Sequence, residues 1–232
     1  MIARSLEPEI LDTPGRPLEE LRLSLGLVAQ VNRRLGGLRA LKRHLGPLSR
    51  QQGVLHVLDV GTGNGQTLRE AAAWAARRGT PWRVVGLDRF PGVVRLARGD
   101  GSLPVVRGDG LALPFPSRVF DAVLCTLTLH HFGDEDAVSL LREMARVCRG
   151  IILVNDLERH RLHHLGARAL AATVWRHCSV TRYDGPLSVL RSFTRAELAA
   201  LGRRAGLSGV RVRRHFPFRL VLEARPACEE DR

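Results

Sequence analysis

Lysine is almost absent from this chain: Lys42 is the only one, although lysine and arginine together number 36. Nearly all of the basic charge is therefore arginine, and the formal net charge is +13. The arginines are spread along the whole sequence, and aromatic residues, only 5% of the chain, do not interleave with them. This is not the basic stripe of a nucleic-acid-binding surface. We interpret the charge mainly as a solvated surface, with RNA or an anionic membrane surface as the less favoured partner.

Long apolar runs are also missing, since none approaches the ~20 residues of a membrane-spanning helix. Residues 1–17 carry acids where a signal peptide would have its apolar stretch. The four cysteines lack CxxC spacing, which predicts neither a disulfide framework nor a metal site. We therefore expect a cytoplasmic protein without a transmembrane segment, and 232 residues suit one domain with a sizeable core.

The most informative segment is VLDVGTGNG, Val57 to Gly65. Residues 54–60 are short, apolar and rich in β-branched side chains, which predicts a buried strand. Residues 66–78 have a helical pattern, so the glycines between strand and helix would let backbone N–H groups approach a ligand. A second apolar strand, 82–87, ends in Asp88, where a carboxylate can accept both hydroxyls of a ribose.

One departure from a dinucleotide fingerprint is informative. Gln66 stands where the third glycine of GxGxxG would be, and this favours S-adenosylmethionine over NAD. Together with the glycine motif, the segments 103–125, 126–150 and 192–207 occur in the expected order. On these four blocks the chain resembles the class I (Rossmann-like) S-adenosylmethionine-dependent methyltransferases, and within them the small-molecule and quinone-type branch.

The resemblance and the alternation of elements predict an α/β fold. We expect a doubly wound, seven-stranded, mostly parallel sheet with an antiparallel C-terminal hairpin. Residues 1–50 are expected to form a loosely docked arm and cap helices, and residues 51–228 the Rossmann-like domain. An insertion at about 157–190 is expected to form a lid, with residues 158–178 as one amphipathic helix.

The resemblance also implies a set of cofactor-binding residues. The glycine loop and the acid before it would meet the methionine part, Asp88 the ribose, and Asp109 the adenine amino group. The predicted set is Asp59, Gly61, Thr62, Gly63, Asp88, Arg89, Asp109, Gly110 and Thr126.

Histidines are the candidates for acid–base chemistry. His130 and His131 follow the fourth predicted strand, where a neutral imidazole could remove a proton from a phenol or hydroxyl, and we favour His131. Both can instead be packing residues. His160, His163 and His164 share one helix face, which is either a polar face or a source of ligands or of a base. Asn155 and Asp156 either cap the following helix or face the substrate.

The resemblance implies methyl transfer to a small, hydrophobic acceptor, such as a phenol, polyketide or quinone-like molecule, at oxygen in preference to carbon, and transfer to carbon stays open. Residues 126–129 read TLTL, which lacks the Asn-Pro-Pro-Tyr motif of amino-methylating enzymes. Two alternatives stay open: an RNA methyltransferase that uses the basic surface, and a non-catalytic binding protein of the same fold. The acceptor atom and the oligomeric state are not predicted.

Overall fold

A seven-stranded sheet forms the centre of the computed structural model, which describes residues 2–50, 53–99 and 101–227. The strand order is β3-β2-β1-β4-β5-β7-β6, with β1 to β5 parallel and β7 antiparallel to both of its neighbours. This confirms the predicted doubly wound sheet and its C-terminal hairpin. The strands are β1 Leu55–Val60, β2 Trp82–Asp88, β3 Val105–Arg107, β4 Phe120–Thr126, β5 Cys148–Leu157, β6 Ser208–His215 and β7 Arg219–Arg225.

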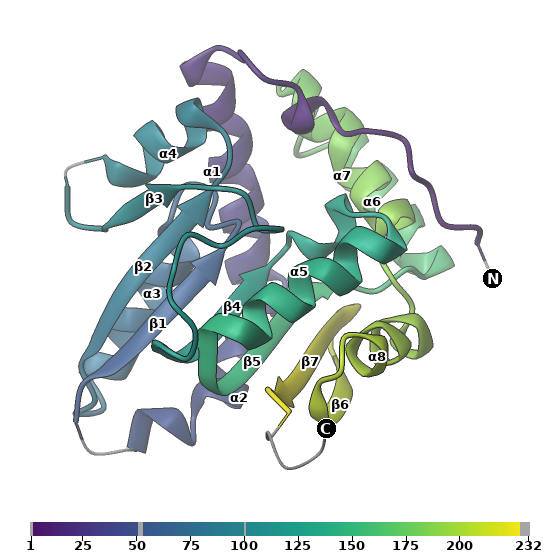
Figure 1. The fold of residues 1–232 in the computed structure, drawn as a ribbon. Coiled ribbons are helices and arrows are strands. Elements are labelled where there is room, and N and C mark those ends of the chain that lie inside the picture. The colour runs from purple at the N-terminus through teal and green to yellow at the C-terminus, as the bar shows by residue number, and fades with distance from the viewer. Residues whose placement is uncertain (1, 51–52, 100, 228–232) are drawn as a thin grey trace.

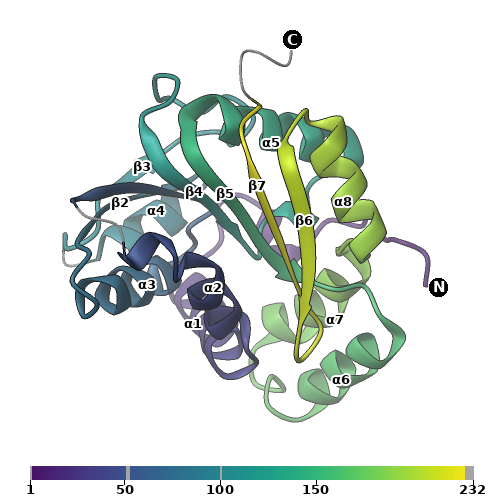
Figure 2. The same ribbon diagram turned by 90° about the horizontal axis from the view of Figure 1, so that it is seen from below.

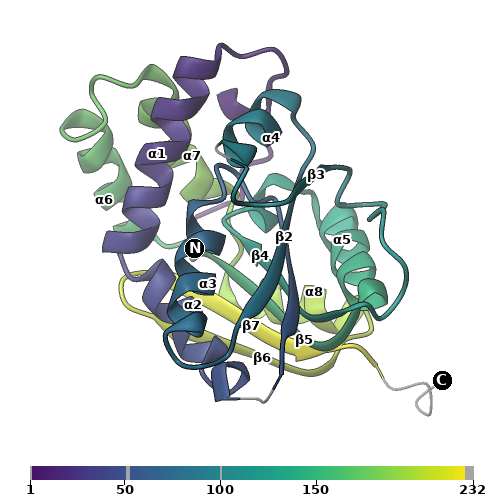
Figure 3. The ribbon, with the colours of Figure 1, turned by 90° about the vertical axis from the view of Figure 1, so that its left-hand side faces the viewer.

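Helices cover both faces of this sheet (Figure 1). Figures 2 and 3 show α2 and α3 on one side and α5 and α8 on the other, while α6 and α7 lie at one end of the sheet beside α1. The α-helices are α1 Leu18–Arg34, α2 Gly37–Leu45, α3 Gln66–Ala76, α4 Pro91–Arg98, α5 Asp134–Val147, α6 Arg161–Ala172, α7 Ser179–Arg191 and α8 Arg195–Arg204.

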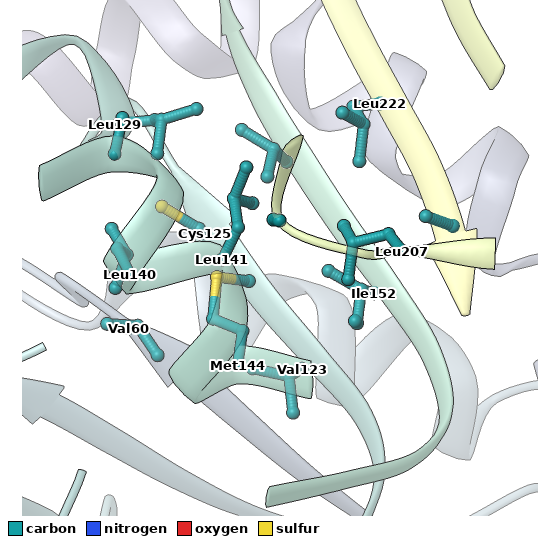
Figure 4. Close-up of a cluster of buried hydrophobic side chains, with 14 of the residues drawn as sticks. Val60, Val123, Cys125, Leu129, Leu140, Leu141, Met144, Ile152, Leu207 and Leu222 are labelled. Atoms are coloured by element: carbon teal, nitrogen blue, oxygen red, sulfur yellow. The ribbon is translucent and has the colours of Figure 1, made fainter. Parts of the chain in front are cut away.

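The core has two halves, one on each face of the sheet. Val57 and Leu124 pack in the half formed with α2 and α3. Their neighbours Leu58 and Val123 pack in the half formed with α5 and α8, which Figure 4 shows in part. Successive strand residues point to opposite faces, and both faces are covered. The central strands are therefore almost wholly apolar, as in other parallel sheets.

The N-terminal arm differs from the expectation of loose docking. Glu9 is only 3% exposed, and the N–H groups of Ile10 and Leu11 donate to the Asp184 carboxylate at 2.8 and 3.0 Å. Arg159 Nε donates to the Ile2 carbonyl at 3.0 Å. The arm is therefore fixed by hydrogen bonds against α7 and the end of β5, and it runs past α7 in Figure 1.

The helix expected over 158–178 is shorter in the structure, because α6 ends at Ala172 and a turn leads to α7, which begins at Ser179. The chain turns between α6 and α7, and α7 contains Gly185 and Pro186, two residues that argue against a helix in a sequence pattern. Gly185 is needed because an added Cβ would lie 2.4 Å from the ring of Trp175. Tertiary packing therefore overrides the local preference here.

The capping interpretation of Asn155 and Asp156 is also wrong. Both residues lie inside β5, and the N-cap of α6 is His160, whose side chain accepts from the N–H of Leu162. The predicted domain limits at residues 51 and 228 fall on residues outside the described ranges.

Candidate active site

A cavity of about 500 Å³ opens at the carboxyl ends of β1, β2 and β4. Parallel sheets present their ligand sites at this edge, because the turns after the strands meet there. The cavity brings together every residue that the sequence predicts for the cofactor, and His131 with them. Its wall includes Asp59, Gly61, Thr62, Gly63, Asp88, Arg89, Asp109, Gly110 and Thr126.

Residues 61–64 of the glycine loop line one side of the cavity. Gly61 has φ +73°, and an added Cβ would lie 2.3 Å from side-chain atoms of Thr128. The N–H groups of Gly61 and Thr62 donate to the Leu87 carbonyl at 2.8 and 2.9 Å, and the Thr128 hydroxyl donates to the Gly61 carbonyl at 3.2 Å. Glycine is therefore required for the close approach of this loop to the turn after β4.

Asp88 is the last residue of β2, and both of its carboxylate oxygens accept hydrogen bonds from backbone N–H groups. Oδ2 accepts from the Gly63 N–H and Oδ1 from the Phe90 N–H, each at 3.2 Å. Burial raises the pKa of Asp88, while these backbone N–H groups act in the opposite direction. Each oxygen retains lone pairs, so this carboxylate can accept a pair of hydroxyl groups from a ligand in the cavity.

Asp59 is the penultimate residue of β1, directly before Val60 and the glycine loop, and it is 3% exposed. Burial raises the pKa of Asp59 to about 7, the neighbouring Thr62 hydroxyl opposes the shift, and the charge of Asp88 adds to it. Within the described residues, Asp59 Oδ1, Thr62 Oγ1 and Thr126 Oγ1 are buried atoms without a partner in hydrogen-bond geometry, although Asp59 and Thr62 lie close enough to interact. Buried polar atoms are normally satisfied. Three such atoms around one cavity fit the polar cofactor that the resemblance implies.

Asp109 and Arg89 lie at the outer rim of the cavity, and the buried Gly110 follows Asp109 in its wall. Asp109 is exposed, and its Oδ1 accepts from the Leu111 N–H at 2.9 Å, which fixes the turn after β3. Arg89 is exposed, with its guanidinium carbon 5.3 Å from the centroid of the Phe90 ring. Asp109 is thus held at the cavity wall, whereas Arg89 lies at its solvent side.

His130 and His131 are brought together with carboxylates from distant parts of the chain. Their rings stack with centroids 4.4 Å apart. His130 is buried, with Nδ1 2.7 Å from Asp156 Oδ1 and Nε2 3.6 Å from Glu9 Oε1. His131 Nδ1 lies 2.9 Å from Asp12 Oδ1. Sequence reasoning missed Glu9 and Asp12, because no local pattern indicates that residues 9–12 pack against residues 130–131.

The carboxylates determine the charge of His131. Burial by itself disfavours the charged ring, but Glu9 and Asp12 outweigh it and raise the pKa of His131 to about 9. His131 is therefore a cation at neutral pH while the arm is docked. It can accept a proton only after its contacts with these carboxylates are lost.

Ligand atoms of Glu9, His130 and His131 lie within 4.8 Å of one another, a spacing that could hold a metal ion. Arg191 Nε lies 3.8 Å from Glu9 Oε1, however, and the positive charge of this guanidinium disfavours a metal cation at the same place. His160, His163 and His164 do not converge on a site. His160 caps α6. His163 Nδ1 lies 2.9 Å from the Glu158 carbonyl oxygen, and His164 Nδ1 lies 3.2 Å from the Pro186 carbonyl oxygen.

A second cavity of about 400 Å³ adjoins the first. Its walls come from α1, α6, α7 and the turn between β6 and β7, and most of the lining side chains are apolar. The two cavities share part of their wall. The shared residues are Leu11, Leu25, Val28, Leu127 and His131.

Comparison with known proteins agrees with this architecture. Residues 58–151 match the family model of a methyltransferase domain. The chain is 38% identical over 93 residues to a demethylmenaquinone methyltransferase of Corynebacterium kroppenstedtii, covering 40% of this chain and 37% of the relative. It is 36% identical over 105 residues to a fatty-acid O-methyltransferase of Mycolicibacterium smegmatis, covering 43% and 36%. The match thus spans less than half the length of these relatives.

Solved structures extend the likeness to the whole fold. A SAM-dependent methyltransferase from Aquifex aeolicus superposes with a TM-score of 0.64 at 16% identity, covering 92% of this chain and all of that one. Among the helices of the described residues, none has the length and apolar character needed to cross a membrane.

Proposed function

We propose that this chain is a class I S-adenosylmethionine-dependent methyltransferase that transfers a methyl group to a small hydrophobic acceptor at an oxygen atom. One observation carries the proposal. A cavity with acidic and polar walls meets an apolar cavity at a shared wall that includes His131 and Leu127. A polar cofactor and an apolar acceptor can therefore meet at that wall.

The first cavity is proposed to hold S-adenosylmethionine, which when bound supplies an electrophilic methyl group on its sulfonium. Asp88 would bind the ribose hydroxyls and Asp109 the adenine amino group. Asp59 and Thr126 would meet the amino-acid end, where their unpartnered oxygens, Asp59 Oδ1 and Thr126 Oγ1, lie. These residues orient the cofactor and take no part in bond making.

The second cavity is proposed to bind the acceptor and to exclude water from it. Leu25 and Val28 of α1 and Leu170 of α6 contribute to its wall. Relatives of this chain bear the names demethylmenaquinone methyltransferase and fatty-acid O-methyltransferase, which is in keeping with an apolar acceptor. Alignment in such a site can supply much of the rate enhancement of a displacement reaction.

The acceptor hydroxyl must lose a proton, and His131 is the proposed base because it lies at the wall that both cavities share. In the docked state Glu9 and Asp12 keep it protonated. His131 would therefore become a base only when the arm moves away on acceptor binding. His130, paired with Asp156, would position the neighbouring ring and the turn that carries it.

The first test is calorimetric titration of the protein with S-adenosylhomocysteine, with NAD alongside. Micromolar binding of S-adenosylhomocysteine alone is the expected result. An acceptor panel with S-adenosylmethionine, analysed by mass spectrometry, should then show methyl ethers of apolar hydroxyl compounds. Binding without turnover on a broad panel would favour the non-catalytic alternative, and binding of neither S-adenosylhomocysteine nor NAD would contradict the proposal.

A specific surface feature favours the RNA alternative as a second candidate. α8 and β6 together form a shallow hollow surrounded by arginines: Arg195, Arg203, Arg211, Arg213 and Arg214. Steep salt dependence of RNA binding, lost when these arginines are replaced, would support that function. Methylation of RNA but not of small acceptors would replace the main proposal.

In either function the arm and α1–α2 are proposed as a cap on the domain, with residues 157–190 as the acceptor lid. A cytoplasmic location is proposed as well. It is supported by Cys125, Cys148 and Cys178, which are buried free thiols.

A further inference from the structure

The apolar acceptor cavity contains one unusual residue, the arginine at the start of β7. Arg219 pairs in register with Leu157 of β5, and its side chain is almost completely enclosed, with 1% of the residue exposed. It lines the acceptor cavity but not the cofactor cavity. An arginine is rarely buried unless it is paired, so its partners need to be identified.

Arg219 has no adequate partner within the described part of the chain. Its Nη1 is buried without a hydrogen bond, and no carboxylate of these residues lies within the 4.0 Å of an ion pair. The nearby acid is Asp156, whose charge acts on Arg219 from a greater distance. Asp156 is already engaged, because its oxygens bond His130 and the Leu157 N–H.

The guanidinium nevertheless keeps its charge. Burial lowers the pKa of Arg219 to about 10, and Asp156 opposes that shift, so the group is protonated at neutral pH. The carboxylates in the cavity wall do not neutralise it. Glu9 accepts from the Ser188 hydroxyl at 2.9 Å, and Asp184 accepts from Ile10 and Leu11 of the arm.

A second unpartnered donor belongs to the same cavity. Trp175, in the turn between α6 and α7, lines the wall, and its Nε1 is buried with no partner among the described residues. Its ring is held against Gly185. Indole and guanidinium groups only donate hydrogen bonds. Both groups therefore need a hydrogen-bond acceptor, and the cation Arg219 favours an oxygen acceptor with negative charge.

His163, which also lines this cavity, adds no charge beside Arg219. Its Nδ1 bonds the Glu158 carbonyl, which makes this nitrogen the donor. Burial lowers the pKa of His163 to about 4, so the ring is neutral and adds no second cation beside Arg219. The positive charge of this part of the cavity is thus that of Arg219 itself.

We infer that the acceptor is an apolar molecule that carries a carboxylate, and that Arg219 binds this carboxylate. A planar guanidinium matches a carboxylate with two parallel hydrogen bonds, and the pairing is strong where water is excluded. The inference rests on the proposed function and narrows its substrate class. It also assigns different roles to two groups of the acceptor. The carboxylate is an anchor away from the shared wall, and another oxygen of the molecule receives the methyl group.

The test uses an alkyl-substituted hydroxybenzoate and its neutral carboxamide as matched probes. Calorimetry is carried out on the whole protein saturated with S-adenosylhomocysteine. The unaltered protein should bind the carboxylate about tenfold or more tightly than the amide, as expected for a charged hydrogen-bond pair. In Arg219→Gln the two probes should bind within about twofold of each other, while the affinity for S-adenosylhomocysteine stays unchanged.

Two further variants serve as controls, one for the loss of an arginine from β7 and one for poor folding of Arg219→Gln. Arg225→Gln removes an exposed arginine from the same strand and should retain the carboxylate preference. Arg219→Lys keeps the charge without the planar fork and should retain part of the preference, even if the glutamine variant folds poorly. Equal binding of the two probes by the unaltered protein, or a preference that survives in Arg219→Gln, would overturn the inference.

Product analysis separates this inference from the proposed function. With S-adenosylmethionine the hydroxybenzoate should yield a methyl ether with a free carboxylate. A methyl ester would contradict the anchor role of Arg219 while leaving methyltransferase activity intact. Failure to bind S-adenosylhomocysteine at all would contradict the proposed function, whatever the probes do.

Discussion

At the scale of single residues, Asp88 is the most direct test of the cofactor cavity. Two backbone N–H groups orient its carboxylate toward that cavity. Asp88→Ala removes a charged acceptor for buried hydroxyls and should weaken S-adenosylhomocysteine binding by about 1–3 kcal/mol. Calorimetry measures this loss, and Glu19→Ala on the exposed face of α1 serves as the control. Unchanged affinity in Asp88→Ala would show that the ribose does not lie at β2.

His131 gives a second prediction at this scale, because its charge depends on the arm. Its pKa is raised from 6.5 to about 9 by Glu9 and Asp12 against the effect of burial. Protonation of His131 therefore stabilises the folded state fully below pH 6.5, and this contribution is lost as the pH rises through about 9. In Asp12→Asn the pKa of His131 should fall.

NMR titration of the imidazole ring measures that pKa directly. Asp121→Asn, beside Arg149 and His56 and away from the arm, should leave it unchanged. If His131 of the unaltered protein titrates at its ordinary value, the arm carboxylates do not control it.

At the scale of elements, the packing of α6 against α7 shapes the proposed acceptor cavity. Gly185→Ala would place a Cβ 2.4 Å from the Trp175 ring, and the ring would have to move. We expect a loss of about 1–3 kcal/mol in the free energy of unfolding and weaker acceptor binding. The affinity for S-adenosylhomocysteine should not change, because neither residue lines the cofactor cavity.

Gly166 provides the matched control for this change. It lies inside α6 and lines the same cavity, but an added Cβ meets nothing within 4 Å. Gly166→Ala should therefore stabilise the protein by about 0.5–1 kcal/mol through helix propensity. Denaturant unfolding compares the two variants, and equal stability of both would contradict the close contact at Trp175.

At the scale of the whole molecule, the cofactor cavity lies between the sheet, the arm and α1, so a ligand there should stabilise all of them together. S-adenosylhomocysteine at a hundred times its dissociation constant should add about 2.7 kcal/mol. For a chain of this size that corresponds to a rise of about 5–10 °C in Tm. Calorimetric melting with and without the ligand measures the rise. No change in Tm at saturation would contradict a binding site within the fold.

The sequence by itself determined the sheet, the glycine loop and the acids at the strand ends. These features depend on local patterns: apolar runs such as residues 54–60, positive-φ glycines such as Gly61, and a carboxylate directly after a strand such as Asp88. In a parallel sheet the strand ends meet at one edge, so the spacing along the chain already implies that Asp59, Asp88 and Asp109 approach one cavity.

Only the tertiary structure decided which distant residues meet in the acceptor cavity. The N-terminal arm reaches residues 130–131 and Asp184, and its carboxylates change His131 from an expected base into a cation. Arg219 sits in a hairpin whose alternating pattern predicts a strand but not a buried charge. The charge state of a side chain depends on burial and on neighbours brought together by folding, and neither is encoded in any local stretch of sequence.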